Sequence, residues 1–241
     1  NFTLVHDDIM DEAESRRGKQ TVHIRNGLPT AILAGDNMLI LAFQMFEGCR
    51  PDVLSVFLKT AQEVSNGQQM DMNFEESSDV TMLDYLEMIR LKTAVLLGCS
   101  CYVGAANAGA DSETSHKMYA FAEQMGMAFQ MQDDWLDTFG SKAETGKTEG
   151  GDIISKKKMW LYLKAKEKEN TIDDIYMMED PARRIKEARA YFKQLSLDSE
   201  LLAEQDKYYQ KSLEILNSLN LGEEKIFPFL EIASFLKNRR H

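Results

Sequence analysis

The chain has 241 residues, of which 44% are hydrophobic and 28% charged, and its formal net charge is -11. This length and composition suffice for one substantial core, so the sequence predicts a single domain over residues 1–241. The negative charge argues against nucleic acid as a partner, because such binding depends on clustered Lys and Arg. The three cysteines have no paired spacing and no matching His cluster, which excludes a recognisable disulfide framework or zinc site and favours a reducing, cytoplasmic setting.

Apolar residues recur at three- and four-residue steps along most of the chain, clearly so in residues 29–46 and 116–137. No stretch alternates for long enough to predict a sheet. The predicted class is therefore all-α, with short connections between antiparallel helices. Gly, Pro and Asp predict breaks between helices at residues 27–29, 48–51, 111–112, 140–152, 180–181 and 222–228.

The longest uncharged run, residues 93–110, has the length of a membrane span. Gly98, Gly104, Asn107 and Gly109 interrupt it, and it is rich in small residues. We therefore expect a closely packed, buried helix, and we do not expect an integral membrane protein.

The pattern Asp-Asp-x-x-Asp occurs twice, as "DDIMD" near the start and as "DDWLD" more than a hundred residues later. One such pattern should arise by chance only about 0.1 times in a chain of this Asp content. On a helix its first and last Asp lie one turn apart on the same face. Carboxylates this close repel one another unless a cation neutralises them, and oxygen ligands without His or Cys select Mg²⁺ or a similar ion. The candidate metal ligands are Asp7, Asp8, Asp11, Asp133, Asp134 and Asp137.

Basic residues follow each of these motifs. Arg16 and Arg17 come within about two helical turns of the first. A glycine-containing segment with Lys147 follows the second, and residues 156–158 are three lysines. Mg²⁺ that is held by few carboxylates keeps positions for phosphate oxygens, so these cations predict a phosphate-bearing substrate in the same space.

These residues resemble the motifs of the trans-type polyprenyl diphosphate synthases, which include the farnesyl and geranylgeranyl diphosphate synthases. "DDIMDEAESRRG" resembles the first Asp-rich motif with its Arg pair, and "GQQMD" and "KTA" resemble the central elements. "FQMQDDWLD", "TGK" and "GGDI" resemble the second Asp-rich region, so the resemblance covers the whole chain. It implies a bundle of long antiparallel helices around a deep central cavity, usually as a homodimer. Members carry further helices with a Gly-Lys-x-x-Arg element before the first motif; we expect an N-terminally incomplete version that lacks this part of the isopentenyl diphosphate site.

The resemblance implies a Mg²⁺-dependent condensation of isopentenyl diphosphate with an allylic diphosphate (dimethylallyl, geranyl or farnesyl diphosphate). The resemblance implies that Mg²⁺ is ligated by Asp7, Asp11 and Asp133, with Asp8, Asp134 and Asp137 as further ligands or supporting groups. It implies that Arg16 contacts the allylic diphosphate, that Arg17 contacts isopentenyl diphosphate, and that further diphosphate contacts come from Lys92, Lys147 and Lys157. It also implies that Thr93 and Gln130 make polar contact with the developing allylic cation. Lys92, Thr93 and Gln130 are the catalytic candidates.

Phe2 is the candidate for setting product length. It lies five residues before Asp7, which is roughly 7–8 Å along a helix axis. A bulky residue there, followed by a small one, resembles the geranylgeranyl synthase pattern, whereas farnesyl synthases tend to add a second aromatic where this chain has Thr3. We expect a C20 product, with C15 as the alternative.

Other readings fit the residues less well. A class I terpene cyclase shares the first Asp motif but uses an Asn/Ser/Glu pattern at its second site. A di-iron bundle needs two Glu-x-x-His elements, and only residues 113–116 supply one. A P-loop at residues 140–148 has one residue too many between its glycines. A non-catalytic subunit of a heteromeric synthase is the alternative from another class, although loss of carboxylates from one motif is expected there and both are intact.

Overall fold

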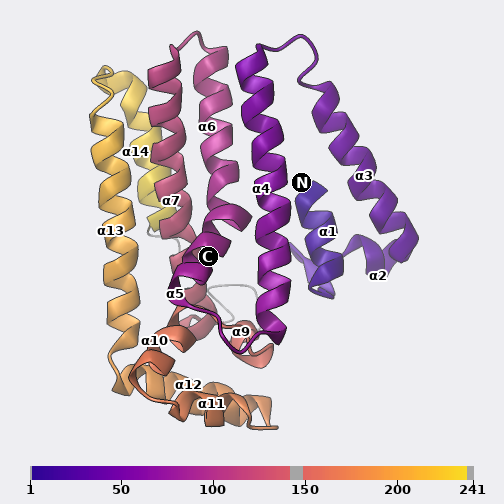
Figure 1. Cartoon of the computed structure of the whole chain (residues 1–241), viewed down its shortest axis with the longest axis vertical. Coiled ribbons are helices and arrows are strands. Elements are labelled where there is room, and N and C mark those ends of the chain that lie inside the picture. Colours follow the sequence, from indigo (N-terminus) through magenta and orange to yellow (C-terminus); the bar gives the residue numbers. More distant parts are fainter. Residues whose placement is uncertain (1, 142–148, 238–241) are drawn as a thin grey trace. The chain divides into compact units, whose positions relative to one another are not determined.

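The computed structural model describes residues 2–141 and 149–237, and these residues are almost wholly helical (Figure 1). The elements are α1 (Phe2–Met10), β1 (Ser15–Arg16), β2 (Lys19–Gln20), α2 (Val22–Asn26), α3 (Leu28–Gln44), α4 (Pro51–Glu76), α5 (Met82–Ile89), the π-helix η1 (Arg90–Ala94), α6 (Val95–Asn107), α7 (Ser112–Phe139), α9 (Gly151–Ile154), α10 (Trp160–Lys168), α11 (Thr171–Tyr176), α12 (Pro181–Gln194), α13 (Leu197–Asn217) and α14 (Glu223–Lys237). The predicted all-α class is confirmed. The chain divides into two compact units, residues 1–55 and 56–241, and the single-domain expectation stays a prediction.

In the first unit, α1 and α2 pack against α3. Gly35 of α3 permits the close approach of α1, because a Cβ there would lie 2.2 Å from Nε2 of the His6 ring. The same ring nitrogen lies 3.3 Å from the carbonyl oxygen of Ile32. Ala31 is fully buried in this contact layer. Two small residues on α3 thus let α1, with the first Asp motif, lie close to it.

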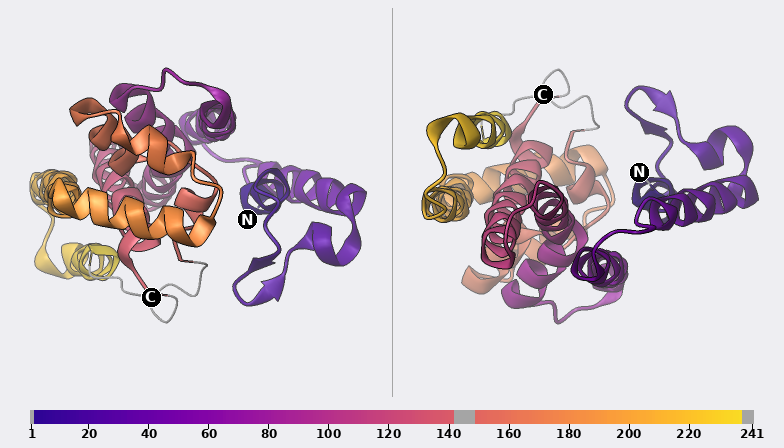
Figure 2. Two further views of the ribbon diagram at one scale, coloured as in Figure 1. Left: turned by 90° about the horizontal axis from the view of Figure 1, so that it is seen from below. Right: turned by 90° about the horizontal axis from the view of Figure 1, so that it is seen from above.

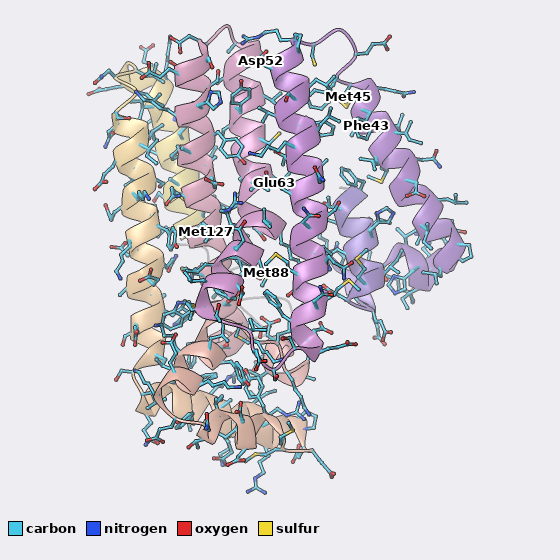
Figure 3. All side chains as sticks on the ribbon, in the orientation of Figure 1. Phe43, Met45, Asp52, Glu63, Met88 and Met127 are labelled. Atoms are coloured by element: carbon cyan, nitrogen blue, oxygen red, sulfur yellow. The ribbon has the colours of Figure 1, made fainter. Side chains whose placement is uncertain are left out.

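In the second unit, α7 packs along both α6 and α13, and α10, α11 and α12 lie across one end of these long helices (Figure 1, Figure 2). The core at this end joins residues that are far apart in sequence, from α5 to α13. Met88 of α5 and Met127 of α7 are two of its members (Figure 3). The second Asp motif therefore stands at the end of a helix that is held by neighbours along its whole length.

The predicted helix boundaries at residues 111–112 and 180–181 are confirmed. Asp111 caps α7 by accepting a hydrogen bond of 2.7 Å from the backbone N–H of Thr114. Asp180 caps α12 in the same way, and Pro181 occupies the first helical position, where its missing N–H costs nothing. Pro228 differs from the prediction, because it lies inside α14 instead of in the preceding break. It stands at an exposed position near the start of that helix, where a carbonyl without a partner can turn to water.

The uncharged run at residues 93–110 forms the end of η1 and α6. Residues Met82–Asn107 are, by length and composition alone, apolar enough to cross a membrane, the one such helix among the described residues. Within this stretch η1 and α6 pack along α7, and Val95, Cys99 and Tyr102 are buried, whereas Leu96 and Leu97 are exposed. The expectation of close packing is confirmed, but the helix is buried on one face only.

Candidate active site

The first Asp motif ends α1. Asp7 and Asp8 lie in the helix, and Asp11 follows its last residue, with its backbone N–H donating to the carbonyl of Asp7 at 2.8 Å. This bond places Asp7 and Asp11 one turn apart, as the spacing predicts. Asp8 is buried, whereas Asp7 is half-buried and Asp11 exposed. Within the motif, exposure therefore increases from Asp8, which lies against the protein, through Asp7 to Asp11.

Arg16 pairs with two carboxylates of this motif within the first unit. Its Nε donates to Oδ1 of Asp8 at 2.6 Å, and its Nη2 donates to Oδ2 of Asp7 at 3.2 Å. Two guanidinium nitrogens on two carboxylates are a strong, charge-assisted arrangement. Sequence spacing predicted that Arg16 lies near the motif; it did not predict this direct pairing.

Arg17 stands at the turn of a small hairpin that the sequence pattern did not predict. β1 and β2 pair through Arg16 and Lys19, so Arg17 and Gly18 form a two-residue turn, and both have positive φ, 53° and 73°. Two successive positive φ values are typical of the tight hairpin turn, and Gly18 adopts its value without strain. The turn directs two consecutive arginines differently: Arg16 lies in a strand beside Asp8, and Arg17 is exposed.

A pocket of about 220 Å³ opens in the first unit beside these residues. Its polar lining residues are Asp8, Arg16, Arg17, Gln20 and Thr21, and Leu4 is among its apolar lining residues. Thr21 is held in place because its hydroxyl donates to the carbonyl of Ala13 at 2.7 Å. The pocket combines two arginines with a carboxylate, which suits an anion that arrives with a cation.

The second Asp motif occupies the last turns of α7, and its three members differ in environment. Asp133 and Asp137 are half-buried, and Asp134 is buried. Oδ2 of Asp137 accepts the backbone N–H of Asp152 at 3.0 Å, and its carbonyl accepts the N–H of Gly150 at 2.9 Å. Asp137 thus ties the start of α9 to the end of α7.

Asp134 faces the interior and belongs to a chain of hydrogen bonds. Tyr85 of α5 donates to its Oδ2 at 2.6 Å, and the amide of Gln130 donates to its Oδ1 at 3.0 Å. Burial raises the pKa of Asp134 to about 7, although these two hydrogen bonds act in the opposite direction. Burial and the nearby Asp134 also raise the pKa of the Tyr85 hydroxyl, so Tyr85 remains a donor. Sequence reasoning missed Tyr85, because nothing in its local pattern marks a partner on α7.

The chain continues to Thr93 of η1, whose hydroxyl donates to Oε1 of Gln130 at 3.1 Å. Gln130 is therefore fixed at both ends of its amide, with its oxygen toward Thr93 and its nitrogen toward Asp134. Thr93 and Gln130, which were both expected to face the allylic cation, are thus in direct contact, and that role stays a prediction.

Lys92, beside Thr93, turns to a different neighbour. Its Nζ donates to Oδ2 of Asp71 on α4 at 2.7 Å, and Nζ of Lys157 donates to the same oxygen at 3.4 Å. Burial tends to raise the pKa of Asp71, but the two ammonium groups outweigh it and lower the pKa below its ordinary value. Three segments that are distant in sequence thus meet in one ion cluster.

The segment that carries Lys92 and Thr93 is a π-helix, confirmed by the hydrogen bond from the N–H of Val95 to the carbonyl of Arg90, five residues back. It is held closely on two sides. A Cβ at Gly67 of α4 would lie 2.3 Å from the backbone N of Lys92, and a Cβ at Gly126 of α7 would lie 2.6 Å from Cα of Ala94. Both glycines are therefore required for the close approach of the helices.

The family model for "Polyprenyl synthetase" matches residues 1–193. The chain belongs to the polyprenyl synthetase family.

Relatives and solved structures agree with this membership. The chain is 44% identical over 171 residues to a geranylgeranyl pyrophosphate synthase of Geoglobus acetivorans, covering 68% of this chain and 53% of the relative. It is 36% identical over 234 residues to a geranylgeranyl diphosphate synthase of Sulfolobus acidocaldarius, covering 91% of this chain and 70% of the relative. A crystal structure of a geranylgeranyl pyrophosphate synthase superposes with a TM-score of 0.93 at 37% identity, over all of this chain and 78% of the other. The chain spans about half the length of several curated relatives that it matches.

The oxygen-only ligand set of this polyprenyl synthetase chain fits Mg²⁺. Among the residues that the structure describes, no three His, Cys, Asp or Glu side chains already form a metal cage. Mg²⁺ does not need one, since proteins usually bind it through one or two carboxylates and leave the other positions to water and substrate phosphate. Asp7 with Asp11, and Asp133 with Asp137, each offer such a pair one helical turn apart.

The remaining predicted residues are placed as follows. Phe2 and Thr3 form the start of α1 and are half-buried, so Phe2 and Asp7 share one continuous helix, as the product-length argument requires. Lys147 lies outside the described residues.

Proposed function

We propose that the protein is a trans-prenyltransferase that condenses isopentenyl diphosphate with an allylic diphosphate (dimethylallyl, geranyl or farnesyl diphosphate) in a Mg²⁺-dependent reaction. One observation carries this proposal: Lys92 and Thr93 are adjacent on η1 yet serve two clusters, a cationic one with Asp71 and a polar one with Gln130. Ionisation of an allylic diphosphate needs both kinds of group, because negative charge grows on the diphosphate and positive charge on the carbon skeleton.

The residues then divide the work of the reaction. As the allylic C–O bond breaks, Lys92 and Lys157 stabilise the charge on the leaving diphosphate. The Thr93 hydroxyl donates a hydrogen bond to Oε1 of Gln130, so its own oxygen keeps lone pairs that can face the allylic cation. Mg²⁺, held by the Asp motifs when bound, would neutralise further charge on the diphosphate. The double bond of isopentenyl diphosphate attacks the cation head-to-tail, and the proton that is lost passes to the released diphosphate.

We further propose a C20 product, geranylgeranyl diphosphate, with C15 as the alternative. Phe2 stands one and a half turns before Asp7 on α1, where its ring can end a channel that begins at the carboxylates. Relatives named geranylgeranyl diphosphate synthase support this length. Others at 38% and 41% identity are named geranylfarnesyl diphosphate synthase, so family similarity alone does not decide it.

A cytoplasmic homodimer is the proposed form. The apolar side chains that α3 leaves exposed support the dimer: Leu33 is 60% exposed and Leu41 58%. Met45, which follows the helix and is labelled in Figure 3, is 86% exposed. The cysteines within the described residues are free thiols, which fits a reducing compartment. A non-catalytic subunit is the less favoured alternative, because both Asp motifs and the catalytic candidates are present.

The test is incubation of the complete protein with Mg²⁺, isopentenyl diphosphate and each allylic diphosphate in turn, with products read by mass spectrometry. We expect C20 prenyl diphosphate, and no product when EDTA replaces Mg²⁺. Absence of condensation with every allylic substrate would refute the enzyme and favour the subunit.

A further inference from the structure

Asp71 is a buried carboxylate that has not been given a role in binding metal or substrate. It lies on α4 with 8% of its surface exposed. Its Oδ2 accepts from Lys92, 21 residues later in the chain, at 2.7 Å and from Lys157, 86 residues later, at 3.4 Å. A buried ion is costly unless it is paired, so this carboxylate and the two ammonium groups depend on one another.

The structure around Asp71 fixes both lysines. Gly67 stands one helical turn earlier on the same face of α4, and its lack of a Cβ lets the backbone of Lys92 pack directly against that helix. Lys92 is thus held by α4 at its backbone and at its ammonium group.

Lys157 is fixed through its neighbours. Its backbone N–H donates to the carbonyl of Asp152 at 2.8 Å. Nζ of the next residue, Lys158, donates to the carbonyl of Phe74 at 2.6 Å and to that of Glu75 at 3.2 Å. These bonds attach the segment to the last turn of α4, one turn beyond Asp71, where carbonyl groups lack partners within the helix. Lys157 is therefore brought to Asp71 by contacts on both sides of it.

We propose that Asp71 is a positioning residue, which holds the ammonium groups of Lys92 and Lys157 together as a preformed pair for the diphosphate of the allylic substrate. Two cations at one site repel each other, and a shared carboxylate oxygen removes most of that repulsion while the cluster keeps a net positive charge. Charges that are already in place need no reorganisation when the diphosphate leaves. The identity of the substrate in this proposal rests on the proposed function, whereas the contacts of Asp71 with the two lysines are independent of it.

The first test is Asp71→Asn, which keeps the shape of the side chain and removes its charge. We expect kcat with the allylic substrate to fall about 10- to 100-fold, the scale of a hydrogen bond to a charged group, because the two lysines separate. KM for isopentenyl diphosphate should change less than about twofold, and Asp71→Glu should restore part of kcat. The matched control is Asp206→Asn, which removes a carboxylate that pairs with Lys237 outside the site and should leave kcat unchanged.

A double-mutant cycle distinguishes positioning from a general structural role. In the Lys92→Ala background, Asp71→Asn should cost less than about threefold, because the group through which it acts is already gone. A full additive loss in that background, or an unchanged kcat for Asp71→Asn alone, would overturn the proposal. Urea unfolding of each variant shows whether the fold itself has been weakened.

A second measurement does not depend on activity. Acylation of lysines by an N-hydroxysuccinimide ester, followed by mass spectrometry, reports how firmly each ammonium group is paired. Asp71→Asn should speed labelling of Lys92 and Lys157 several-fold and leave labelling of Lys237 unchanged. Asp206→Asn should speed labelling of Lys237 and leave labelling of Lys92 and Lys157 unchanged. If the wild type has no prenyltransferase activity but this pattern appears, the proposed function fails and the positioning role stands. If activity is present and labelling of both lysines is unchanged, only the positioning role fails.

Discussion

The contact of Gly67 with η1 makes a prediction whose size follows from the structure. In Gly67→Ala the new Cβ would lie 2.3 Å from the backbone N of Lys92, where ordinary contact begins at 3.4 Å. The two helices would have to separate by about 1 Å, since the opposing atoms are backbone and cannot swing aside. Retreat of η1 is opposed on its other side by α7, because Gly126 packs so closely on η1 that a Cβ there would lie 2.6 Å from Cα of Ala94.

The magnitude combines two opposing effects. Replacing a helical Gly with Ala contributes about 1 kcal/mol of stability through backbone entropy. Overpacking against backbone on both sides costs about 3 kcal/mol, the upper end of the usual range. We therefore expect a net loss of about 2 kcal/mol. With a urea dependence of about 3 kcal/mol per molar, the unfolding midpoint should fall by about 0.7 M.

Tryptophan fluorescence during urea titration is a suitable assay, because both tryptophans, Trp135 and Trp160, lie in the second unit. Gly104→Ala is the matched control: Gly104 is also a helical glycine of that unit, but a Cβ there would meet nothing within 4 Å. It should gain about 0.5–1 kcal/mol. If Gly67→Ala proves as stable as Gly104→Ala, the close packing of α4 on η1 is wrong.

The other predictions concern turnover, substrate binding and product length. Asp7→Ala and Asp133→Ala should each lower kcat about 100- to 1,000-fold and raise the Mg²⁺ concentration needed for half-maximal rate, and near-normal turnover in either variant would refute the metal assignment. Arg17→Ala should mainly raise KM for isopentenyl diphosphate, and Lys92→Ala should mainly lower kcat for the allylic substrate; equal effects on both substrates would contradict this division. Phe2→Ala should lengthen the products seen by mass spectrometry, whereas an unchanged C20 product from a folded variant would show that another residue ends the channel.

Local patterns in the sequence predicted what local physics decides. The three- and four-residue apolar steps gave the helical class, and capping residues such as Asp111 and Asp180 marked helix starts. The spacing within each Asp motif predicted which carboxylates share a face. Partners across the fold were not predictable in this way: Tyr85 meets Asp134 only because α5 lies beside α7. The turn that exposes Arg17 was missed as well, because two-residue strands are too short to alternate.

The π-helix explains why the catalytic candidates could be named from the sequence but not placed. Periodicity arguments assume 3.6 residues per turn, whereas η1 contains one residue more than an α-helical turn would hold, so the faces of α5 and α6 are offset by one position across it. With that offset, Lys92 reaches the carboxylate on α4 while its neighbour Thr93 reaches the amide on α7. A π-turn is less stable than an α-turn and persists where surrounding contacts hold it. Gly67 and Gly126 supply those contacts, which is why a methyl group on either glycine should disturb the site as well as the fold.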